Sequence, residues 1–221
     1  MCENATYYHG TAHTIDLNGY DQSISRLYRG WQFTTYPDMY VNLTSTTPAL
    51  LEMTTDTVYE DLIALKVTGA AGIKFNMAGS YTFTNVTAST VGTLEVDRGT
   101  VRFAEGSGWT AVTNIVLSGG TLAVAAGAGA KAFGSAQDTS DALLTVVATN
   151  SPTLSIAAGE RPSVNMLMVV EENGKEVWKN PGVYGGPEAG LSDYYTLGWI
   201  SGAGTLRVRH SISGGTMLII R

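Results

Sequence analysis

Apolar and polar side chains alternate one by one along much of this chain. Six four-residue segments place an apolar side chain at every second position, namely residues 93–96, 100–103, 121–124, 153–156, 205–208 and 216–219. This period of two buries one face of a β-strand, whereas apolar residues seldom recur at the three- and four-residue intervals of a helix. The pattern therefore predicts an all-β fold.

Glycine precedes most of these segments and predicts how the strands are joined. Five of the six begin with Thr directly after Gly. Glycine adopts positive φ at little cost and threonine favours extended backbone, so we interpret Gly-Thr as a corner followed by a strand. The threonines lie 7, 21 and 32 residues apart from Thr93 to Thr153, and 11 apart from Thr205 to Thr216. These intervals favour a solenoid with variable loops over the alternative, an antiparallel β-sandwich.

Composition divides what we expect to be a single domain, residues 1–221, into three regions. Residues 1–65 hold only 3 of the 26 glycines. Eight large rings lie instead within residues 7–40, namely Tyr7, Tyr8, Tyr20, Tyr28, Trp31, Phe33, Tyr36 and Tyr40. We expect these rings to form the first turns or to cover the open end of a stacked core. Residues 66–170 are the glycine-rich repeat region, and residues 171–221 predict a hairpin at the acidic turn 171–175, then a long loop and the last turns.

Several segments resemble a known kind of repeat region. Residues 15–24 are similar to the strand–turn–strand segment that opens autotransporter-type β-strand repeat regions. Residues 91–96 and 115–124, both containing Gly-Thr-Leu, resemble the repeats themselves. Residues 172–175, 181–185 and 200–208 resemble the segments that follow such repeats in large secreted bacterial proteins. The resemblance implies a right-handed parallel β-helix with capped ends, in a bacterial protein that is extracellular or displayed on the cell surface.

Charge and hydropathy argue against two classes of partner. The net charge of −6 repels phosphate backbones, so we expect no nucleic-acid partner. The longest apolar run, residues 166–170, is much shorter than the ~20 residues of a membrane-spanning helix, so we expect no membrane insertion. Cys2 is the only cysteine, which rules out a disulfide within the chain. We interpret Cys2 as an inert surface thiol, with a lipid-anchored residue as the alternative.

No set of residues predicts a metal ion or a cofactor. In a strand, His9 and His13 would lie about 13 Å apart, too far to share a metal ion. Asp16, Asn18 and Asp21 resemble part of a calcium loop, but no acidic residue closes that loop near position 27. We interpret the segment as a turn stabilised by Asx side chains.

Paired carboxylates would indicate a sugar-cleaving enzyme, which needs an acid and a base about 5–10 Å apart. The adjacent Glu60-Asp61 pair points to opposite faces of a strand. Glu95 and Asp97 share a face, and we interpret them as a solvated outer surface with Arg98 and Arg102 nearby. The sequence also lacks the Gly-x-Ser-x-Gly elbow of serine hydrolases. We therefore expect no catalytic residues, with a β-helical polysaccharide lyase or hydrolase as the alternative.

Aromatic side chains are the remaining candidates for a binding site, because sugars stack their apolar faces on such rings. A second aromatic group lies in the C-terminal region and comprises Trp178, Tyr184, Tyr194, Tyr195 and Trp199. These rings either contact a glycan or pack the terminal turn, and we favour the packing role.

The function that we expect is that of a non-catalytic structural or adhesive segment of a larger secreted bacterial protein. A carbohydrate-binding module is the first alternative. Glycans or host-surface molecules are the expected partners, and unpaired strand edges at the ends of a solenoid can join a second copy.

Overall fold

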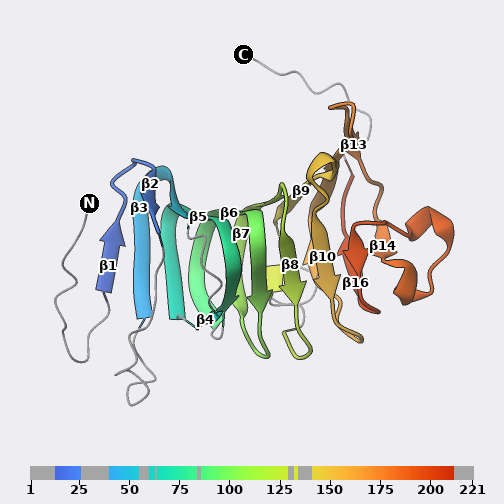
Figure 1. The fold of residues 1–221 in the computed structure, drawn as a ribbon, viewed down its shortest axis with the longest axis horizontal. Helices are drawn as coiled ribbons and strands as arrows, with labels where there is room; N and C mark the ends of the chain where they lie inside the picture. Colours follow the sequence, from blue (N-terminus) through green and yellow to red (C-terminus); the bar gives the residue numbers. More distant parts are fainter. Residues whose placement is uncertain are drawn as a thin grey trace.

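The fold is built from β-strands. The computed structural model describes residues 13–25, 40–54, 60–62, 64–83, 86–128, 132–133 and 141–211. The larger sheet has 13 strands. Its main path runs through β1 (His13–Asp16), β3 (Tyr40–Met53), β5 (Ala64–Phe83), β6 (Val86–Phe103), β7 (Gly108–Leu117), β9 (Leu143–Val147), β12 (Met166–Val170) and β13 (Glu176–Trp178). Figure 1 shows that β1, β3, β5, β6 and β7 follow one another along the long axis of the molecule in chain order.

Five strands of the larger sheet branch from this path. They are β2 (Gln22–Ile24), β4 (Glu60–Leu62), β8 (Thr121–Val124), β10 (Thr153–Ile156) and β15 (Ile200–Ser201). The smaller sheet has the order β11 (Ser163–Val164), β16 (Thr205–Val208) and β14 (Gly182–Gly185). Short 3-10 helices cover Ala148–Asn150 (η3), Pro187–Ala189 (η4) and Asp193–Tyr195 (η5).

Parallel pairing dominates the larger sheet, whereas the smaller sheet has one parallel and one antiparallel ladder. Among the described strands, only β12–β13 and β14–β16 form antiparallel ladders. The predicted all-β class is therefore confirmed, and the sheet is mostly parallel.

Two successive steps along the main path of the larger sheet have the same length. Ile73 pairs with Leu94 and Leu94 pairs with Ile115, so each of these steps covers 21 residues. The same column continues through Leu144 and Leu167. All five side chains are fully buried. Because neighbours in a strand point to opposite faces, the residues directly before and after each of these five positions face away from the core.

β6 runs through a corner at Gly99. The part before the corner pairs with β7, and the part after it pairs with β8. Gly99 has φ 83°, and Gly120, directly before β8, has φ 58°. A backbone in this region is unfavourable for residues that carry a Cβ atom. The predicted Gly-Thr corners are therefore confirmed at these two glycines.

Two other Gly-Thr pairs do not form such corners. Neither Gly92 nor Gly204 has positive φ, and the predicted corner is absent at Gly92; before β16 the chain bends at residues 202–203, with the positive φ of 82° at Gly202 rather than at Gly204. Gly92 lies inside β6, where an added Cβ would be 3.0 Å from the carbonyl oxygen of Ala70. An added Cβ on Gly204 would collide with the carbonyl oxygen of Ala157. Both glycines thus allow close approach of two backbones.

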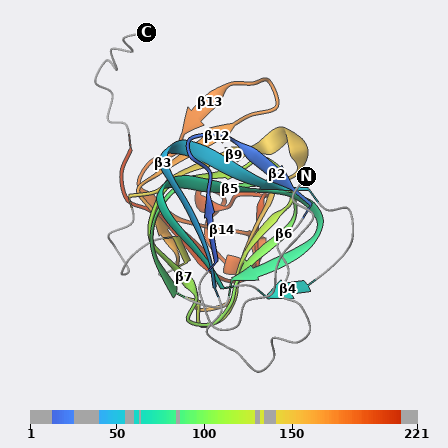
Figure 2. The same ribbon diagram turned by 90° about the vertical axis from the view of Figure 1, so that its left-hand side faces the viewer.

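A second buried column lies beyond the corner. It runs from Val101 through Leu122 and Leu154 to Ile200. Both columns belong to one hydrophobic cluster. Figure 2 looks along the stack and shows the strands arranged around the region that this cluster occupies.

Aromatic rings extend this core. Phe83 and Phe103 stack with centroids 5.1 Å apart and an interplanar angle of 15°. Phe133 packs edge-on against Phe103 at 6.1 Å. Of the N-terminal rings that we expected to cover the core, the structure describes the side chain of Tyr20 alone, and this side chain is 68% exposed. Tyr20 therefore does not cover the core.

The alternation of apolar residues predicted the strands well. Segments 93–96, 100–103, 121–124, 153–156 and 205–208 all lie in strands, with the expected apolar side chains buried. The sixth segment, 216–219, lies outside the described residues.

The two antiparallel strands come from one stretch near the C-terminus. β12 and β13 form the predicted hairpin, in which the Glu171 N–H donates to the carbonyl oxygen of Lys175 at 2.9 Å. Gly174 at the turn has φ 78°. β14 begins a few residues after β13 ends. β13 is the last strand on the main path of the larger sheet, and β14 is the last strand of the smaller sheet. This stretch therefore reverses the strand direction at an edge of both sheets.

Candidate functional site

The C-terminal aromatic residues lie in several different settings. Trp178 ends β13 in the larger sheet and is partly exposed, whereas Tyr184 is buried in β14 of the smaller sheet. Tyr195 ends η5 and is 36% exposed. Trp199 packs against the hydrophobic core, and the side chain of Tyr194 lies outside the described part of the chain. Tyr184 and Trp199 thus pack in the protein interior, whereas the ring of Tyr195 is partly exposed.

Tyr184 and Tyr195 are in direct contact. Their ring centroids are 5.6 Å apart at an interplanar angle of 64°. Tyr184 Oη donates a hydrogen bond to the carbonyl oxygen of Asn180 at 2.7 Å, which fixes the buried ring. Tyr195 also packs over Gly182, where an added Cβ would lie 3.0 Å from Tyr195 Cε1. The exposed ring of Tyr195 is therefore held in place by the smaller sheet.

A basic groove lies on this sheet, next to Gly182. Its volume is about 720 Å³. Arg161, Arg207, Arg209 and His210 line it together with residues 181–183 and 208. The sequence analysis did not single out these cationic residues. The sequence did contain a signal for two of them. Arg207 and Arg209 are two positions apart in and next to a predicted strand, and alternate residues of a strand lie on one face.

Backbone pairing positions these cationic residues. Ser163 of β11 is in register with Arg207 of β16, and the Arg209 N–H donates to the carbonyl oxygen of Val164 at 3.1 Å. On the other side of β16, Val183 of β14 is in register with Arg207. Leu206, the residue before Arg207 in β16, is buried in the core, so Arg207 faces away from it.

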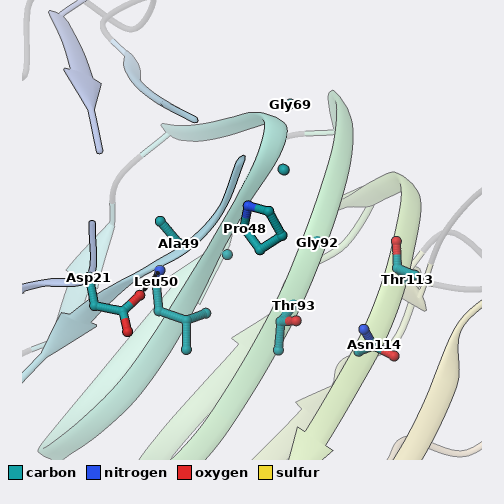
Figure 3. A pocket seen from close by; sticks show the side chains of 11 residues that line it. Asp21, Pro48, Ala49, Leu50, Gly69, Gly92, Thr93, Thr113 and Asn114 are labelled. Carbon is teal, nitrogen blue, oxygen red and sulfur yellow. Dashed lines mark hydrogen bonds between the residues drawn. The ribbon is translucent and has the colours of Figure 1, made fainter. Parts of the chain in front are cut away.

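A second groove, of about 630 Å³, crosses strands β3 to β7 (Figure 3). Asp21, Thr93 and Asn114 contribute polar groups to it. Its floor includes Gly72, where an added Cβ would lie 2.6 Å from Leu50 Cδ2. Asp21 Oδ1 accepts a hydrogen bond from the Leu50 N–H at 2.7 Å. Within the described residues no aromatic ring lines this groove, so it lacks a stacking surface for a sugar.

An ion network lies on the outer face of β3, β5 and β6. Lys74 Nζ is 3.1 Å from Glu95 Oε1, 3.6 Å from Asp97 Oδ2 and 3.9 Å from Glu52 Oε1. Partial burial lowers the pKa of Lys74, but its hydrogen bond to Glu95 and the charges of Glu95, Asp97 and Glu52 outweigh this effect. The pKa of Lys74 is therefore raised above its ordinary value of 10.5.

This network gives the predicted carboxylate pair a different neighbour. Glu95 and Asp97 both contact Lys74, which comes from the preceding strand, β5. Arg102, which the sequence placed near them, lies beyond the corner at Gly99 and is exposed. The two carboxylates thus form part of a salt-bridged outer face.

The segment around Asn18 forms the predicted Asx turn. The Asn18 N–H donates to Asp16 Oδ1 at 2.9 Å, and Asn18 and Gly19 have φ of 49° and 78°. Among the described residues, no group of three or more His, Cys, Asp or Glu side chains could hold a metal ion. Five sequence candidates have side chains outside the described part, namely Cys2, His9, His13, Glu60 and Asp61.

In the part of the chain that the structure describes, no helix has the length and apolar character needed to cross a bilayer. No family model, curated protein or solved structure matches this chain. Its function must therefore be inferred from its own residues.

Proposed function

We propose that this chain is a right-handed parallel β-helix that serves as a non-catalytic structural or adhesive segment of a larger bacterial protein, secreted or displayed on the cell surface. The observation that carries this proposal is the parallel pairing of Ile73, Leu94 and Ile115 at a constant 21-residue step. Such a step is expected when each turn of a coil lies on the one before it. The right-handed sense follows from the strong preference of parallel crossover connections for that hand.

The pairing pattern supports this architecture over an antiparallel sandwich. A sandwich is built from antiparallel sheets, whereas the ladders of β1 through β12 on the main path are parallel. The reversed strands β13 and β14 support a cap at the C-terminal end. The resemblance to autotransporter-type repeats leads us to extend the proposal to secretion.

Disulfide trapping tests the architecture. In a Cys2→Ser background, Thr100→Cys and Thr121→Cys place two thiols on register partners in β6 and β8. We expect rapid oxidation to an intramolecular disulfide, detected by gel mobility and mass spectrometry. The matched control pairs Thr100→Cys with Ala125→Cys, four residues beyond the register partner and about 13 Å further along the strand. Equal cross-linking of both pairs would remove the support for a stacked coil.

Surface display is tested on the cells that make the protein. An antibody against the folded chain should label intact cells, and protease treatment of these cells should abolish the labelling. Labelling that requires lysis would contradict display.

Carbohydrate binding is the second candidate function, because one specific observation favours it. Tyr195 presents a partly exposed ring that is fixed against Tyr184 and Gly182. A glycan microarray should show retention by the wild type and reduced retention by Tyr195→Ala. Trp199→Phe is the control, because Trp199 packs against the core. Equal binding by the wild type and Tyr195→Ala would exclude this ring as a sugar contact.

A further inference from the structure

The outer side of the larger sheet changes from charged to apolar along the main path. One row of register partners crosses seven strands and consists of Glu52, Lys74, Glu95, Val116, Thr145, Met168 and Trp178. Its first three members belong to the ion network of Lys74. From Val116 onward, no member of this row is charged. The two halves of the row therefore suit contacts of different chemistry.

The uncharged half of the row belongs to a wider apolar face on β9, β12 and β13. In β9 and β12, buried side chains alternate with partly exposed ones, so the partly exposed ones share the side that points away from the core. Trp178 joins this side as the register partner of Met168. We define the apolar face by six partly exposed side chains, Leu143, Val147, Met166, Met168, Val170 and Trp178.

This apolar face is separate from the core. None of its six side chains is among those that pack against the hydrophobic cluster. Figure 2 shows β9, β12 and β13 close together on one side of the molecule. Single exposed apolar residues are ordinary, but a contiguous group of them marks a contact surface.

The described part of the chain ends next to this face. The Arg209 N–H donates to the carbonyl oxygen of Val164 at 3.1 Å, and the His210 N–H donates to that of Asn165 at 2.8 Å. Asn165 directly precedes Met166, the first residue of β12. Residues 212–221 follow one residue after His210 and Ser211, and they lie outside the described residues. The last described residues therefore bring this segment to the edge of the apolar face.

The composition of residues 212–221 complements the face. Five of these ten residues are apolar, namely Ile212, Met217, Leu218, Ile219 and Ile220. The exposed Glu176 borders the face as the register partner of Val170, and the exposed Glu172 lies in the adjoining hairpin turn. Residues 194–221 contain neither Asp nor Glu, and Arg221 is basic. The segment therefore meets an apolar surface and an acidic border without like-charge repulsion.

The segment is also long enough to cover the face. Ten extended residues span up to about 33 Å, whereas β9, β12 and β13 together are about 10 Å wide. Gly214 and Gly215 permit a sharp bend before the apolar residues 217–220.

We propose that residues 212–221 dock on the apolar face, with the side chains of residues 217–220 against Met166, Met168 and Trp178. Methionine side chains are unbranched and flexible, so they adapt to partners of different shape. The docked segment removes from water an apolar surface to which other chains would bind.

Photocross-linking in the full chain tests the proposal. In a Cys2→Ser background, Thr216→Cys carries a benzophenone maleimide next to the apolar residues 217–220. Mass spectrometry identifies the cross-linked peptides after irradiation, and a denaturing gel separates cross-links within one chain from those between two. The face variant is Thr145→Glu. The matched control is Thr82→Glu in β5, which likewise replaces a partly exposed threonine between two buried side chains.

Circular dichroism and thermal unfolding check that each variant folds. Met168→Glu is the second face variant if Thr145→Glu does not fold.

We expect cross-links within one chain to peptides of β9, β12 and β13, both in the labelled protein and in the Thr82→Glu control. We expect their loss in Thr145→Glu, because a carboxylate is costly to cover with an apolar segment. Equal yields from the two glutamate variants would refute docking on this face. Cross-links mainly to other parts of the chain, or none at all, would refute it as well. Cross-links mainly between two chains would overturn the proposal in favour of a face that joins two copies.

Discussion

The corner at Gly99 provides a direct test of how closely successive strands approach. Gly99 has φ 83°, and an added Cβ would collide with the carbonyl oxygen of Met77 and lie 2.6 Å from that of Gly79. Gly159 has nearly the same φ, 81°, but an added Cβ there meets nothing within 4 Å. Alanine at Gly159 therefore reports the cost of the backbone conformation alone. Alanine at Gly99 reports that cost together with the displacement of a neighbouring backbone.

The two costs have different expected sizes. A non-glycine residue in the left-handed region costs about 1–2 kcal/mol, which we expect for Gly159→Ala. Forcing atoms into a filled space adds about 1–3 kcal/mol, so we expect Gly99→Ala to be less stable than Gly159→Ala by that amount. With a denaturant slope of about 3 kcal/mol per M urea, the unfolding midpoint of Gly99→Ala should lie roughly 0.3–1 M lower.

Equilibrium unfolding in urea, followed by far-UV circular dichroism and tryptophan fluorescence, measures the difference. Equal midpoints for Gly99→Ala and Gly159→Ala would refute the reasoning, because the close approach of the backbones would then carry no cost.

Three further predictions follow from individual side chains. Leu94→Ala should lower the free energy of unfolding by about 2–5 kcal/mol, measured in urea, because this side chain is fully buried in the first column; a loss below 1 kcal/mol would contradict its place there. Tyr184→Phe should lower it by about 0.5–1.5 kcal/mol through loss of the hydrogen bond to Asn180, and an unchanged midpoint would show that this bond contributes nothing. The raised pKa of Lys74 contributes stability that is fully present below pH 10.5 and is lost as the pH rises through the folded-state pKa. Thermal unfolding of the wild type and Lys74→Met should therefore differ only slightly at neutral pH and converge at alkaline pH; a difference that grows with pH would reverse the assigned sign.

The strands could be predicted from the sequence because alternation depends only on neighbouring residues. Leu94 and Val96, for example, are buried as the pattern requires. The role of each glycine could not be predicted in the same way. Gly99 is required by its positive φ, and Gly92 by the approach of Ala70 from a strand more than 20 residues earlier. The second requirement depends on the register between strands, which a local sequence pattern does not contain.

The candidate site shows the same division. Aromatic density pointed to the C-terminal region, where Tyr195 packs on Gly182, a residue that lines the basic groove. Arg161 was missed because it reaches the groove through the pairing of β11 with β16, and a hairpin and a long loop separate these strands in the chain. Lys74 was missed as the partner of Glu95 for a related reason. The two residues are register partners 21 positions apart, and they become neighbours only once the step between strands is known.

The opposite orientation of β13 and β14 sets a limit on assembly. When the edge strand of a sheet runs in the same direction as the other strands, its unpaired N–H and C=O groups allow a strand of a second molecule to extend the parallel sheet. Here the last strand on each of the two paths runs opposite to its neighbour, so a second molecule that added there through a strand of the common direction would form an antiparallel ladder instead of continuing the parallel stack. Fibre growth from this end is thereby disfavoured by chain direction alone, without any need for bulky or charged blocking groups.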